Sequence, residues 1–190
     1  MKKIVIIFLL AFSLTGQAKA PLPVDSVFQI TNIFTNQDAK DFKLTERRGK
    51  AQVVAMFYTS CKFICPLMID SGLGVDHALS PAERKNLSLL LISIDPARDT
   101  PEALMNIVKK RKLDTTRWTL ARTDEKGVRT TAALLGIRYR MLSNGDFNHT
   151  SAMILLDAEG RIVARTETLG PNPDPVFLAA VKKTLAADKN

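Results

Sequence analysis

The sequence predicts an α/β protein with a mixed sheet and helices on both of its faces. Short apolar runs typical of buried strands alternate along the chain with amphipathic helical patterns, and this alternation is typical of α/β folds. The chain has 190 residues, of which 46% are hydrophobic and 24% charged. That length suits one domain, and that composition excludes a disordered chain or a coiled-coil rod. We therefore expect a single domain over residues 21–190, after a short export segment.

Residues 1–20 have the pattern of a secretory signal peptide. Two lysines precede an apolar stretch over residues 4–14, which is too short for a membrane span of about 20 helical residues. An A-x-A sequence ends at Ala20, but Pro21 disfavours cleavage directly after it, so earlier cleavage and an uncleaved anchor are both alternatives. We expect an exported protein that is periplasmic or attached to the outer face of the inner membrane.

The chain is basic, with 27 Lys and Arg against 19 Asp and Glu and a net charge of +8. Removal of residues 1–20 takes away three lysines and no acid, which leaves a net charge of about +5. Few aromatic residues lie among the basic clusters at residues 47–50 and 109–112, so stacking on nucleic-acid bases is not expected. We expect no nucleic-acid partner. A basic surface would instead favour acidic proteins or a weak association with anionic lipid headgroups.

The first half of the domain contains two buried strands separated by a helix. Residues 52–58 and 87–94 are apolar runs, the pattern of strands that are covered on both faces. Pro66 suits the first turn of a helix, because the N–H that proline lacks is not needed there. The expected elements are extended segments around residues 27–28, 33–34 and 42–44, strands at 52–58 and 87–94, and a helix from 66 to about 77.

The second half contains two capped helices, a third strand and a hairpin. Thr100 and Pro101 favour a helix start, because the threonine side chain can accept from a free amide of the first turn. Asp124 caps a further helix, and Gly136 ends it. The expected elements are helices that begin near 101 and 125, a strand at 118–120, an extended segment at 137–142 before an Asn-Gly turn, a hairpin of residues 151–156 and 161–166, and a closing helix at 176–185.

The two cysteines of the chain lie at the point where the strand at 52–58 passes into a helix. Cys61 and Cys65 therefore stand at the end of a strand, where α/β folds place their sites. Pro66 places Cys65 near the helix N-cap, so the helix dipole and Lys62 are both expected to favour a thiolate. The pair could be a redox-active disulfide, bind one soft metal ion, or form a purely structural disulfide, although so small a loop stabilises a fold only weakly.

One of the two histidines is a candidate third ligand. His149 comes just before the predicted strand at 151–156, where it is either a surface residue or a partner of the cysteine pair. Two thiolates and one imidazole suit Cu(I) or, together with a water, Zn(II). His77 lies at the end of the helix that follows the cysteines, where its partial positive charge suits the helix dipole, and we expect no ligand role for it.

Three motifs of the sequence resemble those of the SCO/SenC family, which comprises exported copper chaperones of cytochrome oxidase assembly. Residues 57–66 resemble the C-x-x-x-C-P motif of that family, and residues 91–102 resemble its second signature. The third match comprises His149 and residues 154–160. The motifs have the order and spacing of the family, and the similarity runs from about residue 25 to residue 177.

The resemblance implies a thioredoxin-like fold with an N-terminal extension and an inserted hairpin. It also implies that copper is bound through Cys61, Cys65 and His149, as Cu(I) with Cu(II) as a second state. Asp95 matches a family acid near the site, to which we assign a structural, supporting role. Where the family usually has acids in the cysteine loop and before the histidine, this chain has Lys62-Phe63 and Asn148. These differences remove negative charge that would attract a cation.

The expected function is a copper-binding chaperone that delivers copper to the copper A centre of cytochrome c oxidase. The implied partners are subunit II of the oxidase or another copper protein, and a periplasmic copper carrier. The alternative is a thiol–disulfide oxidoreductase that reduces cysteines of an oxidase subunit or copper carrier, with Cys61 attacking and Cys65 resolving. Lys62 favours this alternative, whereas His149 favours metal binding. A peroxiredoxin-like peroxidase is disfavoured, because Cys61 lacks the surrounding motif that positions a peroxide.

Overall fold

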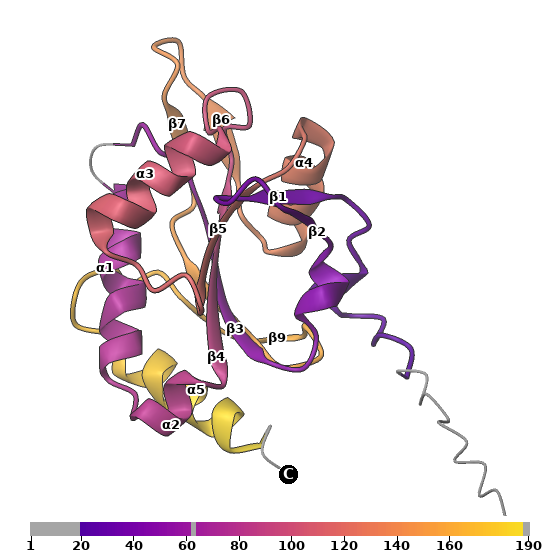
Figure 1. Cartoon of the computed structure of the whole chain (residues 1–190), viewed down its shortest axis with the longest axis vertical. Helices are drawn as coiled ribbons and strands as arrows, with labels where there is room; N and C mark the ends of the chain where they lie inside the picture. The colour runs from indigo at the N-terminus through magenta and orange to yellow at the C-terminus, as the bar shows by residue number, and fades with distance from the viewer. Residues whose placement is uncertain (1–19, 62–63, 188–190) are drawn as a thin grey trace, which may run out of the picture.

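The computed structural model describes residues 20–61 and 64–187. Most of the predicted signal peptide, and Lys62 in the cysteine loop, therefore lie outside the described residues. A central seven-stranded sheet runs through the molecule with strand order β2-β1-β5-β4-β3-β8-β9, and helices cover it on both sides (Figure 1). None of the helices within the described ranges has the length and hydrophobicity of a membrane-spanning segment.

The middle of the sheet is formed by the two strands that the apolar runs predict. β3 (Ala51–Phe57) and β4 (Leu87–Ser93) pair in parallel along their whole length, and β5 (Trp118–Arg122) continues the parallel arrangement. Every residue of β3 is buried, because both faces of the sheet are covered at this strand. On the other side of β3, β8 (Met153–Leu156) pairs antiparallel with it and with β9 (Ile162–Thr166), so the predicted mixed sheet is confirmed.

The helices begin where their caps predict. Thr100 and Asp124 each accept a hydrogen bond from the amide three residues later, and the helices they cap lie on opposite sides of the sheet in Figure 1. Gly136, which follows the second of these helices, has the positive φ of +63° that ends a helix. The helices are α1 (Ile64–His77), α2 (Pro81–Arg84), α3 (Pro101–Arg111), α4 (Glu125–Leu134) and α5 (Pro175–Ala187).

Three segments differ from the sequence prediction. The predicted extended segment 42–44 ends at Lys43, because the Lys43 amide donates to the Glu46 side chain and Leu44 begins a 3-10 helix. Val27–Phe28, predicted as extended, form part of a 3-10 helix, η1 (Val27–Gln29), because the Ser26 side chain accepts from the Phe28 amide and turns the chain. The short helix α2 was not predicted, although Ser80 and Glu83 form a reciprocal capping box at its start. The remaining N-terminal elements are β1 (Phe34–Asn36), β2 (Asp41–Phe42) and a second 3-10 helix, η2 (Leu44–Arg47).

A hairpin inserted between α4 and β8 forms a two-stranded sheet of its own. Its strands are β6 (Tyr139–Met141) and β7 (Phe147–His149), and its turn contains Gly145 with a φ of +82°. The predicted extended segment and Asn-Gly turn are therefore present. His149 lies in the last position of β7, opposite Tyr139, and not in an irregular loop.

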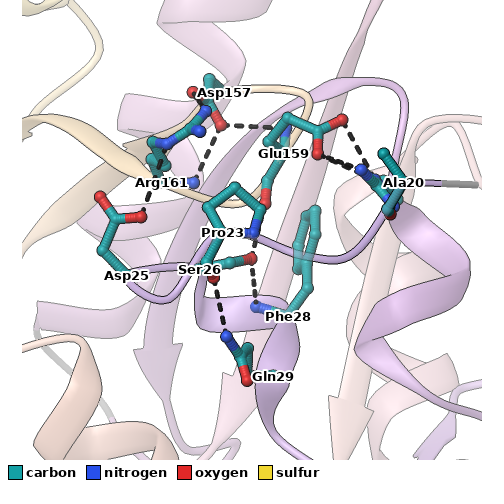
Figure 2. A network of polar contacts seen from close by, with 10 residues as sticks. Ala20, Pro23, Asp25, Ser26, Phe28, Gln29, Asp157, Glu159 and Arg161 are labelled. Atoms are coloured by element: carbon teal, nitrogen blue, oxygen red, sulfur yellow. Dashed lines mark hydrogen bonds and ion pairs between the residues drawn. The ribbon is translucent and has the colours of Figure 1, made fainter.

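The N-terminal extension is attached to the β8–β9 turn by polar contacts (Figure 2). The Ser26 hydroxyl donates to the carbonyl of Glu159 at 2.5 Å, and the Val27 amide donates to the carbonyl of Gly160 at 2.9 Å. The Glu159 carboxylate in turn pairs with Arg48 at 2.5 Å. This turn lies beside the amino end of β3, whereas the cysteines follow its carboxyl end, so the extension is anchored at the opposite end of the sheet.

The close approach of the extension to the turn predicts that Gly160→Ala is strongly destabilising. Gly160 has a φ of +83°, and a Cβ atom there would lie 2.7 Å from two ring carbons of Phe28. Strain and overpacking together should lower the free energy of unfolding by about 3 kcal/mol in a urea titration. Gly49→Ala is the matched control: its φ is +104° but its Cβ would meet nothing within 4 Å, so a loss of about 1 kcal/mol is expected. Equal losses would contradict this packing.

Candidate functional site

The two cysteines are held side by side at the junction of β3 and α1. The backbone amide of Cys65 donates to the Cys61 sulfur at 3.4 Å, and the Tyr58 amide donates to the Cys65 sulfur at 3.5 Å. Besides burial, the nearby Cys61 side chain contributes to raising the pKa of the Cys65 thiol. Cys61 is half-buried, whereas only 3% of Cys65 is exposed. A cavity of about 350 Å³ opens beside both sulfurs and is bordered on the α3 side by Lys110 and Arg111.

Burial decides the protonation of Cys65. The apolar surroundings raise the pKa of the Cys65 thiol well above its usual range, and the hydrogen bond from the Tyr58 amide opposes this only in part. The prediction that the helix start gives a thiolate at Cys65 is therefore wrong for the metal-free protein. Cys65 lies inside the first turn of α1. The loss of hydration there destabilises the thiolate more than the helix dipole stabilises it.

Tyr58 connects the cysteine pair to the inserted hairpin. Besides burial, the nearby Cys61 side chain contributes to raising the pKa of the Tyr58 hydroxyl, which donates to the carbonyl and accepts from the amide of Phe147, both at 3.4 Å. The Tyr58 ring is in edge contact with the His149 ring, at 5.9 Å between centroids. The sequence analysis did not single out Tyr58. Its position, three residues before Cys61 at the end of a buried strand, is the signal that could have found it.

His149 presents one ring nitrogen that no described residue hydrogen-bonds. Its Nδ1 lies 3.0 Å from the carbonyl oxygen of Thr150, which can only accept, so we place the ring proton on Nδ1. The other nitrogen, Nε2, is buried and has no hydrogen-bond partner within residues 20–61 and 64–187. Burial also lowers the pKa of His149, which keeps the ring uncharged. An unprotonated nitrogen oriented by a hydrogen bond at the opposite nitrogen is the form of histidine that binds metals.

The described residues do not contain three His, Cys, Asp or Glu side chains close enough to hold one metal ion. The structure therefore brings Cys61 and Cys65 together and places His149 against the Tyr58 ring, beyond direct reach of the sulfurs. His77, for which no ligand role was expected, is exposed at the end of α1.

A buried carboxylate that the sequence analysis missed holds the turn before Cys61. Asp99 is fully buried and accepts the Thr59 amide at 3.1 and 3.2 Å, the Thr59 hydroxyl at 2.5 Å and the Ser93 hydroxyl at 2.5 Å. Burial raises the pKa of Asp99, and these hydrogen bonds work in the opposite direction. Asp99 thus connects the end of β4 to Thr59, which lies just after β3 and two residues before the first cysteine.

Asp95, the acid expected near the site, contacts the hairpin through Arg98. Its carboxylate is buried and forms an ion pair with the Arg98 guanidinium. Nη2 of Arg98 donates to the carbonyl of Gly145 in the hairpin turn at 2.5 Å, and the guanidinium lies 5.8 Å from the centre of the Phe147 ring. These contacts support a structural role for Asp95: through Arg98 it is connected to the hairpin that carries His149.

A protein-family model described as SCO1/SenC matches residues 20–186, which is nearly the whole described chain. The chain belongs to the SCO1/SenC family. Its sequence is also 30% identical over 85 residues to a SCO1 protein homolog of Bacillus subtilis, a match that covers 45% of this chain and spans 44% of that relative's length.

Solved structures of Sco proteins share the fold. The copper-bound ScoI of Bradyrhizobium japonicum has a TM-score of 0.67 and 22% sequence identity, over 80% of this chain and 96% of that one. BsSco is a member of the Sco family of cytochrome c oxidase assembly proteins in which a disulfide switch was identified. It has a TM-score of 0.68 and 22% identity, over 80% of this chain and 90% of that one. This SCO1/SenC chain thus has the thioredoxin-like fold that the resemblance implied.

The three donors at Asp99 predict a large loss of stability in Asp99→Ala. The substitution leaves the buried Ser93 hydroxyl and the half-buried hydroxyl and amide of Thr59 without this acceptor, so the free energy of unfolding should fall by about 3 kcal/mol in a urea titration. Asp38→Ala, which removes an exposed carboxylate, is the control and should change it by about 0.5 kcal/mol or less. A loss at Asp99 no larger than at Asp38 would show that this network does not hold the junction.

Proposed function

We propose that the protein is a copper chaperone that binds copper through Cys61, Cys65 and His149 and delivers it to the copper A centre of cytochrome c oxidase. The observation that carries this proposal is the buried Nε2 of His149, which has no hydrogen-bond partner in the described part of the chain and lies on the segment that packs against Tyr58, close to Cys61. A buried nitrogen without a partner is unfavourable unless something binds it. The bound copper of the Bradyrhizobium ScoI supports the choice of metal.

The donor set suits Cu(I) in particular. Thiolates are soft ligands that select Cu(I), and imidazole is compatible with both Cu(I) and Cu(II). Copper must displace the thiol protons, and burial makes the Cys65 proton hard to remove. Binding is therefore expected to weaken as the pH falls, because protons compete with the metal for the same sulfurs.

The separation of His149 from the sulfurs suits a metal that has to be released. The cysteines form a ready two-sulfur platform, and the histidine completes the site only when its hairpin moves towards them. A three-coordinate ion at the half-buried Cys61 could then leave by exchange of ligands with a recipient. A cargo ion is expected to be bound in this way, whereas a structural metal is enclosed by a complete set of ligands.

We further propose the place and partners that the sequence predicts. Residues 1–20 are the signal peptide or an uncleaved anchor, residues 21–190 are the functional domain, and the protein works in the periplasm or at the outer face of the inner membrane. Its partners are subunit II of the oxidase or another copper protein, and a periplasmic copper carrier. Basic side chains border both halves of the site and would attract an acidic partner: Lys110, Arg111, Arg138 and Arg140.

A Cu(I) titration of the reduced protein against a competing chelator tests the ligand set. We expect one tightly bound ion per chain, with affinity reduced roughly tenfold or more in His149→Ala and by a larger factor in Cys65→Ser. His77→Ala is the matched control, because this exposed imidazole lies at the far end of α1 and its loss should leave the affinity unchanged. Binding by His149→Ala as tight as by the wild type would remove the histidine from the site.

A thiol–disulfide oxidoreductase is the second candidate, favoured by the contact between the two thiols. The Cys61 thiolate would attack a partner disulfide and form a mixed disulfide. Cys65 would then displace the second partner thiol, so that the partner gains two electrons and two protons and the Cys61–Cys65 disulfide remains. The difference in burial supports this order of attack. Weak copper binding together with fast disulfide exchange would favour this function over the chaperone.

The order of attack predicts that the two cysteines react at different rates. Iodoacetamide should modify Cys61 about tenfold or more faster than Cys65, because Cys65 is buried and its pKa is raised. Trypsin cleaves after Lys62, so the two cysteines fall in separate peptides that mass spectrometry can quantify in one sample. Faster modification of Cys65 would reverse the assignment of the attacking sulfur.

A further inference from the structure

The hairpin that carries His149 needs support from the rest of the domain. β6 and β7 form only three residue pairs with each other, and the seven-stranded sheet of the described chain does not include them. An isolated two-stranded hairpin is marginally stable in water. The position of His149 therefore depends on side chains of the main domain that contact the hairpin.

Arg98 makes the most extensive of these contacts without touching a proposed ligand. Its guanidinium binds the hairpin in two ways: by the 2.5 Å hydrogen bond to the carbonyl of Gly145, and by its place over the Phe147 ring. Phe147 begins β7, and His149 ends it. A contact at one end of so short a strand constrains the other end.

The opposite side of the Arg98 guanidinium is fixed to the body of the protein. Its Nε donates to the buried carboxylate of Asp95, and the Asp95 amide donates to the Ser93 hydroxyl at 2.9 Å. Ser93 is also the residue whose hydroxyl donates to Asp99. One continuous chain of hydrogen bonds therefore runs from the turn before Cys61, through residues 93–99, to the hairpin.

We propose that Arg98 is a positioning residue that holds the β6–β7 hairpin beside Tyr58 and the cysteine pair, so that a short movement of the hairpin brings His149 to the sulfurs, with Asp95 fixing the orientation of the guanidinium. The effect of Arg98 on copper binding rests on the proposed copper function, whereas its effect on the position of the hairpin does not. The planar guanidinium suits the task, because it donates in two directions and stacks on an aromatic ring at the same time. Tyr58 also contacts the hairpin, but its place beside Cys61, a proposed ligand, makes it unsuitable as a test.

Amide hydrogen exchange of the metal-free protein tests the structural part. Arg98→Ala should accelerate exchange at the hydrogen-bonded amides of residues 139–149 roughly tenfold, with no comparable change in β3 and β4. Arg129→Ala is the matched control. It removes the same charge from the edge of the cavity beside the hairpin, but the ion pair that Arg129 forms among the described residues is with the exposed side chain of Glu125. Unchanged hairpin exchange in Arg98→Ala would overturn the proposal whether or not the protein binds copper.

A double-mutant cycle tests the connection to His149. Arg98→Ala should weaken Cu(I) binding about tenfold in the wild-type background, and should have no effect in a His149→Ala background, because the ligand it positions is gone. Arg129→Ala should leave both affinities unchanged. An equal loss in the two backgrounds, or no loss in the first, would overturn the positioning role. If His149→Ala binds copper as tightly as the wild type, the proposed ligand set is refuted instead. The hydrogen-exchange experiment would then still test whether Arg98 holds the hairpin.

Discussion

The buried carboxylate of Asp99 is the constraint on which the arrangement of the site depends. It accepts three donors from the ends of two neighbouring parallel strands, and a carboxylate without solvent is tolerated only when its oxygens are satisfied in this way. Thr59 on one side fixes the turn into the cysteines, and Ser93 on the other side leads to Asp95 and Arg98. Asp99 is thus connected by hydrogen bonds both to the cysteine side and to the histidine side of the proposed copper site.

The cysteine pair and His149 nevertheless differ in how strongly the surrounding structure constrains them. The sulfurs lie between the central strand and the first helix, and each accepts a hydrogen bond from a backbone amide. His149 lies on a hairpin that the main sheet does not include and that side-chain contacts hold in place. Two sulfurs in fixed positions and a third ligand on a movable hairpin would allow a metal ion to be bound and then released, as the proposed delivery to another protein requires.

The elements of the core could be predicted from the sequence because their signals are local. Continuous apolar runs identified β3 and β4, and the caps at Thr100 and Asp124 located two helix starts, since capping involves residues only three positions apart. The capping box of α2 was equally local and was overlooked. Val27–Phe28 were mispredicted because the burial of Phe28 and the cap from Ser26 outweigh its β-propensity.

The site could be predicted only as far as motifs suggest ligands. Cys61, Cys65 and His149 were proposed from residue type and resemblance and stay a prediction as ligands, whereas the contacts that arrange them join residues about 40 or more positions apart. No sequence pattern revealed that Asp99 accepts from Thr59 or that Arg98 reaches Gly145. The wrong expectation for Cys65 has the same origin, because its degree of burial is a property of the assembled core.

The most direct test of the account is the X-ray absorption spectrum of the Cu(I)-loaded, reduced protein. The account predicts a copper shell of two sulfur atoms and one nitrogen atom, with the scattering pattern of an imidazole ring. A shell of sulfur alone would contradict it, because the hairpin and the contacts that hold it would then have no part in binding the metal.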